Sequence, residues 1–419
     1  MAPAGPDADM DPQQRSVARR TFWACFAGWA LDGFDVQLYS FAIPALIALW
    51  SLSTAAAGWL ATAALVTSAL GGWGAGLLAD RIGRARTLRW TIAWFAVFTG
   101  ASALTQNFDQ LLVARALQGL GFGGEWVAGA VLIGEIADPA WRGRAVGGVQ
   151  SAWAVGWGAA TLVATASFAL LPQAWAWRAL FAAGVLPALS VLWMRRGVPE
   201  SPVFAAARLC VARRQAPRGT ASALAAIFRP PLLGLTLRGS LLAIGAQGGY
   251  YAIATWLPSF LRDSRGLSVV GSGGYLAVVI AGSFAGYLAS AWLCDALGRR
   301  RNLVVFAVGA LAVTVLYTRP WLSPASSLAV GFPLGFFASG LFSGLGPLYT
   351  ELYPTAVRAG GQGFCYNFGR GVAALAPAGV GALSARLPLG AAIGVFAAAA
   401  YGLVVLAALS LPETRGRAL

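Results

Sequence analysis

Two acidic residues inside the first long apolar segment are the strongest candidates for chemistry in this sequence. Asp32 and Asp35 are three residues apart, so a helix presents both carboxyl groups on one face, with Tyr39 one turn further along. Two carboxyl groups close together in a low-dielectric cavity favour a protonated form for at least one of them. The spacing predicts a proton-binding pair in which Asp35 is the deeper group. The alternative is that one Asp pairs with an Arg only to fix helix packing.

The fourth apolar segment carries a second polar stripe. Arg115, Gln118 and Glu125 fall on one helical face by their spacing. The Arg is expected to pair with Asp32 or Asp35, or to bind a substrate carboxylate through two parallel hydrogen bonds. Alternatively, it lies close enough to the end of the segment to reach lipid headgroups. Glu125 is a second candidate for proton binding, although the glycines beside it also fit close helix packing.

Arg370, in the eleventh apolar segment, needs an anion that its own helix does not contain. We expect an anionic substrate to supply it, with Asn367 one turn away as a hydrogen-bonding neighbour. The alternative is a salt bridge across the protein to one of the intramembrane acids. In the seventh segment, Gln247, Tyr250 and Tyr251 are expected to face the same cavity, although aromatic residues also populate helix interfaces and membrane-surface belts.

Pairs of an acid and an Arg follow several of the apolar segments. At helix ends on the cytoplasmic surface, such ion pairs would hold an inner gate closed. The pairs are Asp80 with Arg84, Glu135 with Arg142, Asp295 with Arg299, and Glu351 with Arg358. Asp80 and Arg84 are the favoured gate residues. The others are expected to serve mainly as scaffolding, because Arg clusters in cytoplasmic loops satisfy the positive-inside rule by themselves.

The composition excludes several classes of protein. Of 419 residues, 58% are hydrophobic and only 11% are charged, so the chain has room for roughly a dozen bilayer spans of about 20 residues. The net charge of +15 fits membrane topology better than nucleic-acid binding. His is absent, which excludes His-ligated metal sites and Ser-His-Asp triads, and the four Cys are scattered. We expect no metal, no cofactor, no nucleic-acid partner and no enzymatic activity.

The apolar runs predict twelve membrane-spanning helices in two sets of six. The first set covers 22–49, 55–79, 88–105, 110–134, 146–171 and 177–194, and the second covers 236–261, 270–294, 302–318, 326–350, 360–383 and 389–411. These define a cytoplasmic tail (1–21), an N-terminal bundle (22–194), an Arg- and Pro-rich cytoplasmic linker (195–235), a C-terminal bundle (236–411) and a second tail (412–419). Arg is concentrated in one set of alternating loops, which predicts cytoplasmic termini and a multi-pass protein of the cell inner (plasma) membrane.

The two sets of spans repeat each other. Asp80 to Arg84, after the second span, has a counterpart in Asp295 to Arg299 after the eighth, and Pro199-Glu200-Ser201 has one in Pro412-Glu413-Thr414 at nearly the same offset. Duplicated halves in a polytopic membrane protein indicate a transporter with its site between the halves, near the membrane midplane.

Several of these motifs resemble those of the major facilitator superfamily. Gly76 to Arg86 is similar to the signature loop between its second and third helices, Arg115 to Gly121 to its second motif, and the two Pro-Glu-Ser/Thr triplets to the motifs that close its halves. Leu31 to Asp35, Gly123 to Trp126 and Tyr250 to Pro258 resemble its proton-coupled organic-acid symporters, including the sialate/lactate, metabolite and aromatic-acid branches. The second-half signature loop departs from the pattern, with Ala296 where the first half has Arg81.

The resemblance implies an all-α membrane protein with twelve transmembrane helices in two pseudo-symmetric six-helix bundles. Together with the buried charges, it predicts proton-coupled uptake of a small organic carboxylate anion, such as a monocarboxylate or sialic acid, by alternating access. The expected partners are that anion, protons and the lipid bilayer, with a monomer as the assembly. The alternatives are a proton-coupled sugar or drug carrier on the same scaffold and a non-transporting membrane sensor. Without any Lys there is no phosphate-binding loop for ATP-driven transport.

Overall fold

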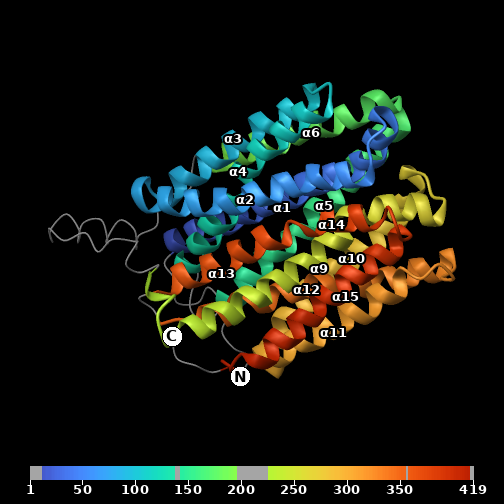
Figure 1. Ribbon diagram of the computed structural model, residues 1–419. Helices are drawn as coiled ribbons and strands as arrows, with labels where there is room; N and C mark the ends of the chain where they lie inside the picture. The colour runs from blue at the N-terminus through green and yellow to red at the C-terminus, as the bar shows by residue number, and fades with distance from the viewer. Residues whose placement is uncertain (1–11, 137–141, 196–224, 355–356, 416–419) are drawn as a thin grey trace.

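The computed structural model describes residues 12–136, 142–195, 225–354 and 357–415, and within these ranges it contains helices and no strands (Figure 1). The first half of the chain forms α1 (Pro12–Trp50), α2 (Thr54–Ile82), α3 (Arg84–Leu104), α4 (Phe108–Ile136), α5 (Arg142–Leu170) and α6 (Gln173–Arg195). The second half forms α9 (Leu233–Arg265), α10 (Val269–Leu297), α11 (Arg299–Tyr317), α12 (Pro324–Leu352), α13 (Arg358–Ala373), α14 (Ala376–Leu383) and α15 (Leu389–Ser410). Eleven of the twelve predicted spans each correspond to one helix.

The predicted span over 360–383 is wrong in one respect, because it is two helices that break between Ala373 and Ala376. Pro377 has no N–H for the carbonyl four residues earlier, and its ring clashes with that carbonyl, so a regular helix cannot continue through it. The Thr62 hydroxyl donates a hydrogen bond of 2.7 Å to the Ala374 carbonyl at the break. A side chain of α2 therefore satisfies a backbone group that the break leaves without a helical partner.

The outer surface of the helices fits a lipid environment. Eight helices within the described ranges are long and apolar enough to cross a membrane. Large exposed tryptophans lie near both ends of the bundle: Trp23, Trp90 and Trp292 towards the end where α1 begins, and Trp59, Trp175 and Trp321 towards the end where α1 stops. Two belts of indole rings are typical of the two membrane–water interfaces.

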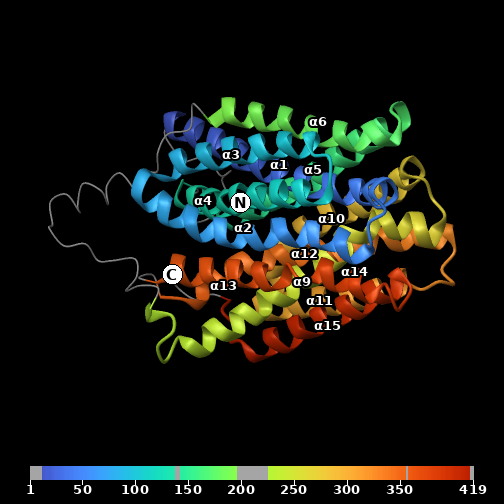
Figure 2. The same cartoon turned by 45° about the horizontal axis from the view of Figure 1, so that its top comes forward.

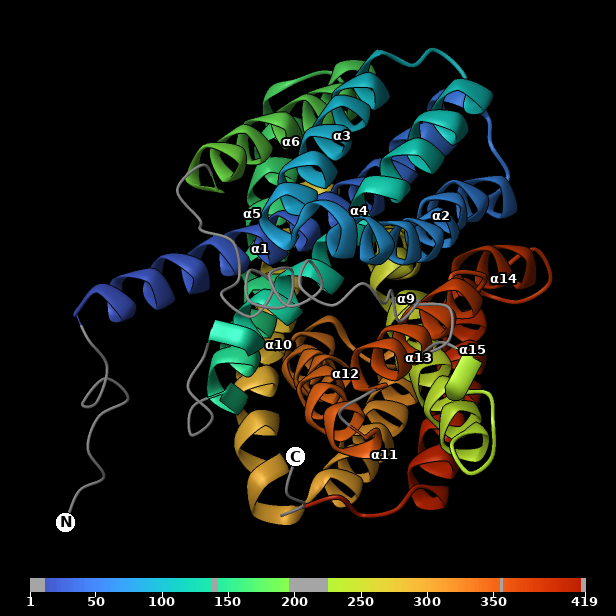
Figure 3. The same ribbon diagram turned by 90° about the vertical axis from the view of Figure 1, so that its left-hand side faces the viewer.

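The helices form two groups, α1–α6 and α9–α15, which lie side by side (Figures 2 and 3). Contacts between the groups run mainly through α5 against α10 and through α2 against α13 and α14. Within the second group, Gly282 and Gly286 lie against the backbone of Phe332 and Phe336, where a Cβ atom would meet a carbonyl oxygen. This agrees with the expectation that small residues permit close helix crossings in the membrane.

The two groups are closed against each other at the end opposite the termini. The Thr54 hydroxyl, on α2, donates to the Gly381 carbonyl at 3.0 Å, and the Ser384 hydroxyl donates to Thr54 Oγ1 at 3.0 Å. The Trp256 indole N–H, on α9, donates to the Pro377 carbonyl at 3.0 Å. We call the contact between Thr54 on α2 and Gly381 on α14 the seam. A Cβ atom on Gly381 would lie 2.5 Å from the Thr54 carbonyl oxygen, so the seam requires glycine at this position.

Gly381→Val is expected to open this end of the protein, because the added side chain cannot fit against the α2 backbone. A cysteine in place of Ala61, which lines a cavity below the seam, in a protein whose four native cysteines are replaced, then reacts several-fold faster with a polar thiol reagent. Gly402→Val is the matched control, since a Cβ atom at Gly402 meets nothing within 4 Å. Equal labelling rates in the two variants would show that the seam does not control access.

Candidate functional site

Asp35 on α1 and Arg115 on α4 form a buried ion pair. Each residue is about 3% exposed, and Arg115 Nη1 lies 3.5 Å from Asp35 Oδ2. Gln118 bridges the two, because its Oε1 accepts from Arg115 Nη1 at 2.6 Å and its Nε2 donates to Asp35 Oδ1 at 2.7 Å. Asp35 is thus the partner of Arg115. The alternative that Arg115 extends to lipid headgroups is wrong, because its guanidinium is enclosed by protein.

Thr99 on α3 completes this cluster, and sequence reasoning missed it. Its hydroxyl accepts from Gln118 Nε2 at 2.6 Å and donates to Asp35 Oδ1 at 3.2 Å. The Asp35 carboxylate therefore accepts hydrogen bonds from three side chains, Thr99, Gln118 and Arg115, so both of its oxygens are engaged. A lone Thr in an apolar segment carries no signal of such a role, since Thr usually bonds within its own helix.

A small cavity lies beside the Asp35 cluster. Its wall includes Ala61 on α2 and Phe95 on α3, so it is bordered by α1 to α4 from the first half and by α9 from the second; the other lining residues include Asp35, Tyr39, Arg115, Gln118, Phe122 and Thr255. Tyr39 contributes its ring, which lies 4.9 Å below the Arg115 guanidinium, while its hydroxyl donates to the Ala57 carbonyl at 2.5 Å. The ring of Tyr39 is available to this cavity, and its hydroxyl is already engaged by α2.

Arg370 on α13 is a second buried cation, 1% exposed. Its guanidinium carbon lies 5.1 Å from the ring centre of Phe122, across the interface between the halves, and 5.0 Å from that of Tyr366. Asp32 and Tyr251 are close enough to act on it electrostatically. Nε and Nη1 of Arg370 have no hydrogen-bond partner among the residues that the structure describes. Arg370 therefore has unpaired donors in this part of the chain, and its role in binding a substrate carboxylate stays a prediction.

Asn367 lies one turn before Arg370, as expected from the spacing. Its Nδ2 donates to the Gly363 carbonyl at 3.0 Å, whereas its Oδ1 is buried without a hydrogen-bond partner within the described ranges. A Cβ atom on Gly72 would lie 2.6 Å from that Oδ1, so the amide faces α2. Asn367 thus sits at the contact between the halves next to Arg370.

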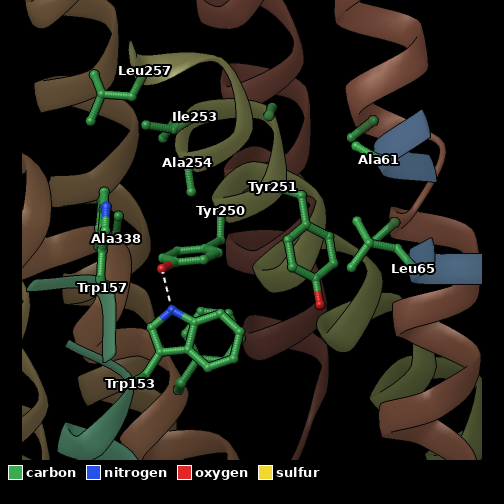
Figure 4. Close-up of a cluster of buried hydrophobic side chains, with 14 of the residues drawn as sticks. Ala61, Leu65, Trp153, Trp157, Tyr250, Tyr251, Ile253, Ala254, Leu257 and Ala338 are labelled. Atoms are coloured by element: carbon green, nitrogen blue, oxygen red, sulfur yellow. Dashed lines mark hydrogen bonds between the residues drawn. The ribbon is translucent and has the colours of Figure 1, made fainter. Parts of the chain in front are cut away.

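Aromatic side chains of α5 and α9 lie together, among them Trp153, Tyr250 and Tyr251 (Figure 4). The Trp153 indole N–H donates to the Tyr250 hydroxyl at 2.6 Å, and the Trp153 ring lies 6.5 Å from Phe122. Tyr251 donates to Gln247 Oε1 at 3.3 Å, and Gln247 Nε2 donates to the Tyr366 carbonyl at 2.9 Å. The three residues predicted on the seventh span are therefore together near Arg370. Phe122 and Trp153 were missed, because a ring in an apolar run looks the same whether it packs or lines a site.

Six predicted residues have side chains outside the part of the chain that the structure describes. These are Glu125 among the proton-site candidates and Asp80, Arg84, Glu135, Arg142 and Arg358 among the gate candidates. Their roles stay predictions.

The gate candidates of the second half form a charge network at the end that holds the termini. Arg299 bonds to Asp295 Oδ1 at 3.0 Å and to Glu351 Oε1 at 2.8 Å. The Thr414 hydroxyl donates to Glu351 Oε2 at 2.6 Å, and Glu413 accepts from the backbone N–H groups of Arg299 and, at 3.2 Å, of Arg300. Glu351 was expected to pair with Arg358, and in the structure it pairs with Arg299.

Glu413 caps the N-terminus of α11. Burial alone would raise the pKa of this carboxyl group, but backbone N–H groups of Arg415, Arg299, Thr414 and Arg300 donate to it and hold its pKa below the usual value. The helix dipole acts in the same direction. The Pro-Glu-Thr triplet therefore fixes the C-terminal segment to the start of α11.

Glu413→Gln is expected to lower the free energy of unfolding by about 0.5–1 kcal/mol at pH 7, because a charged cap becomes neutral. The pKa is lower in the folded protein than in the unfolded chain, so this stabilisation is present at neutral pH and is lost as the pH falls through the folded-state pKa. Thermal unfolding of the purified protein at pH 7 and at successively lower pH measures it. The difference between the two proteins narrows as the pH falls below 4.5, the ordinary value for this carboxyl group, towards its lower folded-state pKa. A difference that does not shrink over this range would contradict the capping role.

Comparison with known proteins agrees with this architecture. Residues 25–377 match the Major Facilitator Superfamily. A probable 4-methylmuconolactone transporter from Cupriavidus pinatubonensis (strain JMP 134 / LMG 1197) is 45% identical over 411 residues, which cover 97% of this chain and 92% of that protein. The cis,cis-muconate transport protein of Acinetobacter baylyi (strain ATCC 33305 / BD413 / ADP1) is 32% identical over 400 residues, or 94% of each chain.

A solved structure of the proton:xylose symporter XylE, bound to 6-bromo-6-deoxy-D-glucose, has the same fold, with a TM-score of 0.76. It is 19% identical and covers 96% of this chain and 98% of its own. The match to the family over most of the sequence, the two similar relatives and the twelve-span architecture lead to one conclusion: this chain is a member of the Major Facilitator Superfamily, and it is a membrane transporter rather than an enzyme.

Proposed function

We propose that the protein takes up a small organic carboxylate together with protons by alternating access. The observation that carries this proposal is Arg370, a fully buried cation with two unsatisfied donor atoms among the described residues, at the contact between the halves. A buried guanidinium requires an anion, and a carboxylate can accept hydrogen bonds from its unpaired donors. A neutral sugar would leave compensation of this charge to protein groups such as Asp32.

The surroundings of Arg370 favour a planar, unsaturated acid over lactate or sialic acid. Phe122, Tyr366 and Tyr251 lie against or near its guanidinium, and Trp153 and Tyr250 continue the aromatic wall. Rings of this kind stack on flat π-systems, whereas a hydroxyl-rich sugar acid needs many hydrogen-bonding groups. The relatives named as transporters of 4-methylmuconolactone and of cis,cis-muconate support the same substrate class.

The proton is assigned to the Asp35 cluster. With Asp35 ionised, its charge is balanced by Arg115, and Gln118 and Thr99 complete its hydrogen bonds. Protonation removes the negative charge that holds Arg115, so the cluster must rearrange. Phe122 lines the Asp35 cavity and also lies under Arg370, which brings the proton site and the anion site into contact through one side chain.

Transport then follows from pairing of charges. A carboxylate at Arg370 and a proton at Asp35 lower the free energy needed to enclose charged groups in the membrane. The protein with both bound therefore changes from one open state to the other, through a state closed on both sides, more readily than the protein with only one bound. The seam between Thr54 and Gly381 acts as the gate on one side. Acid–Arg networks such as that of Arg299 with Glu351 support the gate on the other.

Uptake into proteoliposomes under an imposed inward proton gradient tests the proposal. The panel contains labelled cis,cis-muconate, benzoate, lactate, sialic acid and xylose, each with and without a protonophore. We expect accumulation of the unsaturated acids above equilibrium, and its collapse with the protonophore. Gradient-dependent accumulation of xylose alone would favour the sugar carrier. Binding of an acid without any uptake would favour the membrane sensor.

A further inference from the structure

Two buried polar side chains beside Tyr250 have unused hydrogen-bonding groups. Gln37 on α1 is 0% exposed, and within the described ranges neither of its amide atoms has a hydrogen-bond partner. Trp157 on α5 is 2% exposed, and its indole N–H likewise has no partner in the same part of the chain. Buried polar groups in folded proteins are nearly always hydrogen-bonded, so two unpaired polar side chains beside one tyrosine require an explanation.

Comparable residues nearby are satisfied by the protein itself. Gln118 bonds to Arg115, Asp35 and Thr99, and Gln247 bonds to Tyr251 and the Tyr366 carbonyl. The indole groups of Trp153 and Trp256 each donate to a protein oxygen. Their unpaired state sets Gln37 and Trp157 apart from these four residues, although buried groups elsewhere, such as the Tyr317 and Tyr401 hydroxyls, also have no partner within the described ranges.

Gln37 and Trp157 both lie beside Tyr250. The Trp157 ring centre lies 6.5 Å from that of Tyr250, with the rings edge to face, and the two residues lie side by side in Figure 4. The Gln37 amide is close enough to act on the Tyr250 hydroxyl, without a hydrogen bond of acceptable geometry. Tyr250 itself is engaged as acceptor from Trp153.

This position is linked to Arg370 by a chain of aromatic contacts. Arg370 lies over Phe122, Phe122 lies 6.5 Å from Trp153, and Trp153 lies 6.2 Å from Tyr250. A flat molecule along these rings would have a cation at one end. At the other end it would meet an indole N–H, which only donates, and an amide that offers two further N–H groups.

We propose that Gln37 and Trp157 form a second polar subsite that binds a hydrogen-bond-accepting oxygen on the substrate. The substrate class is then a planar acid with two polar ends: a carboxylate for Arg370 and a carbonyl, lactone or second carboxylate oxygen for Gln37 and Trp157. This inference rests on the proposed function. An acid with a plain hydrocarbon tail leaves both donors unpaired and binds more weakly, because a buried donor without a partner loses its hydration and gains nothing.

A matched pair of probes tests the subsite. 4-Acetylbenzoate and 4-isopropylbenzoate differ in a carbonyl oxygen in place of a methyl group, and their affinities are measured by calorimetry on the full-length protein in lipid nanodiscs. We expect the acetyl compound to bind roughly five- to tenfold more tightly, the value of one or two neutral hydrogen bonds. Gln37→Leu and Trp157→Phe each reduce this ratio towards one and leave the affinity for 4-isopropylbenzoate unchanged or higher.

Two controls separate a binding role from a structural one. Trp94→Phe removes an indole N–H that donates to the Leu117 carbonyl on the exposed side of α3, and it keeps the wild-type ratio. Gln37→Leu keeps or raises the unfolding temperature, because it removes polar atoms that make no hydrogen bond in the described protein. A fall in unfolding temperature would mean that Gln37 serves the fold.

The outcomes distinguish this inference from the proposed function. Equal binding of both acids, with Arg370→Ala weakening both, overturns the second subsite and leaves the carboxylate site intact. A wild-type preference that survives in both Gln37→Leu and Trp157→Phe also overturns the subsite. If neither acid binds, or if Arg370→Ala has no effect, the carboxylate site fails and the subsite fails with it.

Discussion

Asp35→Asn is expected to abolish proton-driven accumulation of substrate. Asn retains the shape of Asp, and its carbonyl oxygen can accept the hydrogen bonds from Thr99 and Gln118, but its amide nitrogen cannot accept from Arg115 and it cannot exchange a proton. In proteoliposomes with an inward proton gradient, internal substrate should stop at the external concentration instead of rising above it. Exchange of labelled for unlabelled substrate across the membrane, which needs no net proton movement, should persist.

A control separates loss of coupling from loss of folding. Asp109→Asn removes a carboxylate from an exposed position at the start of α4 and should accumulate substrate like the wild type. Undiminished proton-driven accumulation by Asp35→Asn would exclude Asp35 as the coupling group. Attention would then move to Asp32 and Glu125, the other acids predicted within the spans.

Arg370→Ala is expected to weaken binding of carboxylate substrates by about a hundredfold, because a buried charge-assisted pair with the substrate is lost. Arg370→Lys should recover only part of this affinity, since an ammonium group lacks the planar pair of donors and stacks less well on Phe122 and Tyr366. Calorimetric titration of the purified protein with cis,cis-muconate at constant ionic strength measures the three affinities.

The matched control is Arg238→Ala, which removes an exposed Arg on α9 that donates to the Ser410 carbonyl at 3.1 Å. Its substrate affinity should equal that of the wild type. Full affinity in Arg370→Ala would show that the carboxylate binds elsewhere, with Arg115 as the next cation to test. A loss in both variants would indicate a general effect on folding or on surface charge.

The local signals in the sequence were sufficient for the helical spans. A membrane-spanning helix satisfies its backbone groups within one segment, so apolar length alone reveals it. The broken eleventh span was missed because Pro377 sits inside an apolar run, and a proline in a membrane helix is tolerated when a neighbour such as Thr62 supplies a hydrogen bond.

The sequence also identified which charges are buried, but the identity of their partners required the folded structure. Asp35 pairs with Arg115. In the sequence, Asp32 was an equally possible partner, because it lies one turn earlier on the same helix. Glu351 pairs with Arg299 from another helix, where the nearby Arg358 had seemed the natural partner. Pairing depends on which helix faces meet and at what height, and a single sequence contains no information on either.

By itself, the sequence therefore determined a chain of twelve apolar helices in two related halves, with a few ionisable groups that the membrane makes costly to leave unpaired. Tertiary structure alone decided that Thr99 and Gln118 complete the Asp35 cluster and that Phe122 lies between its cavity and Arg370. It also decided that Gln37 and Trp157 are left unpaired beside Tyr250. The physical reason is that hydropathy and helix periodicity are properties of neighbours along the chain, whereas hydrogen bonds between helices depend on packing across it.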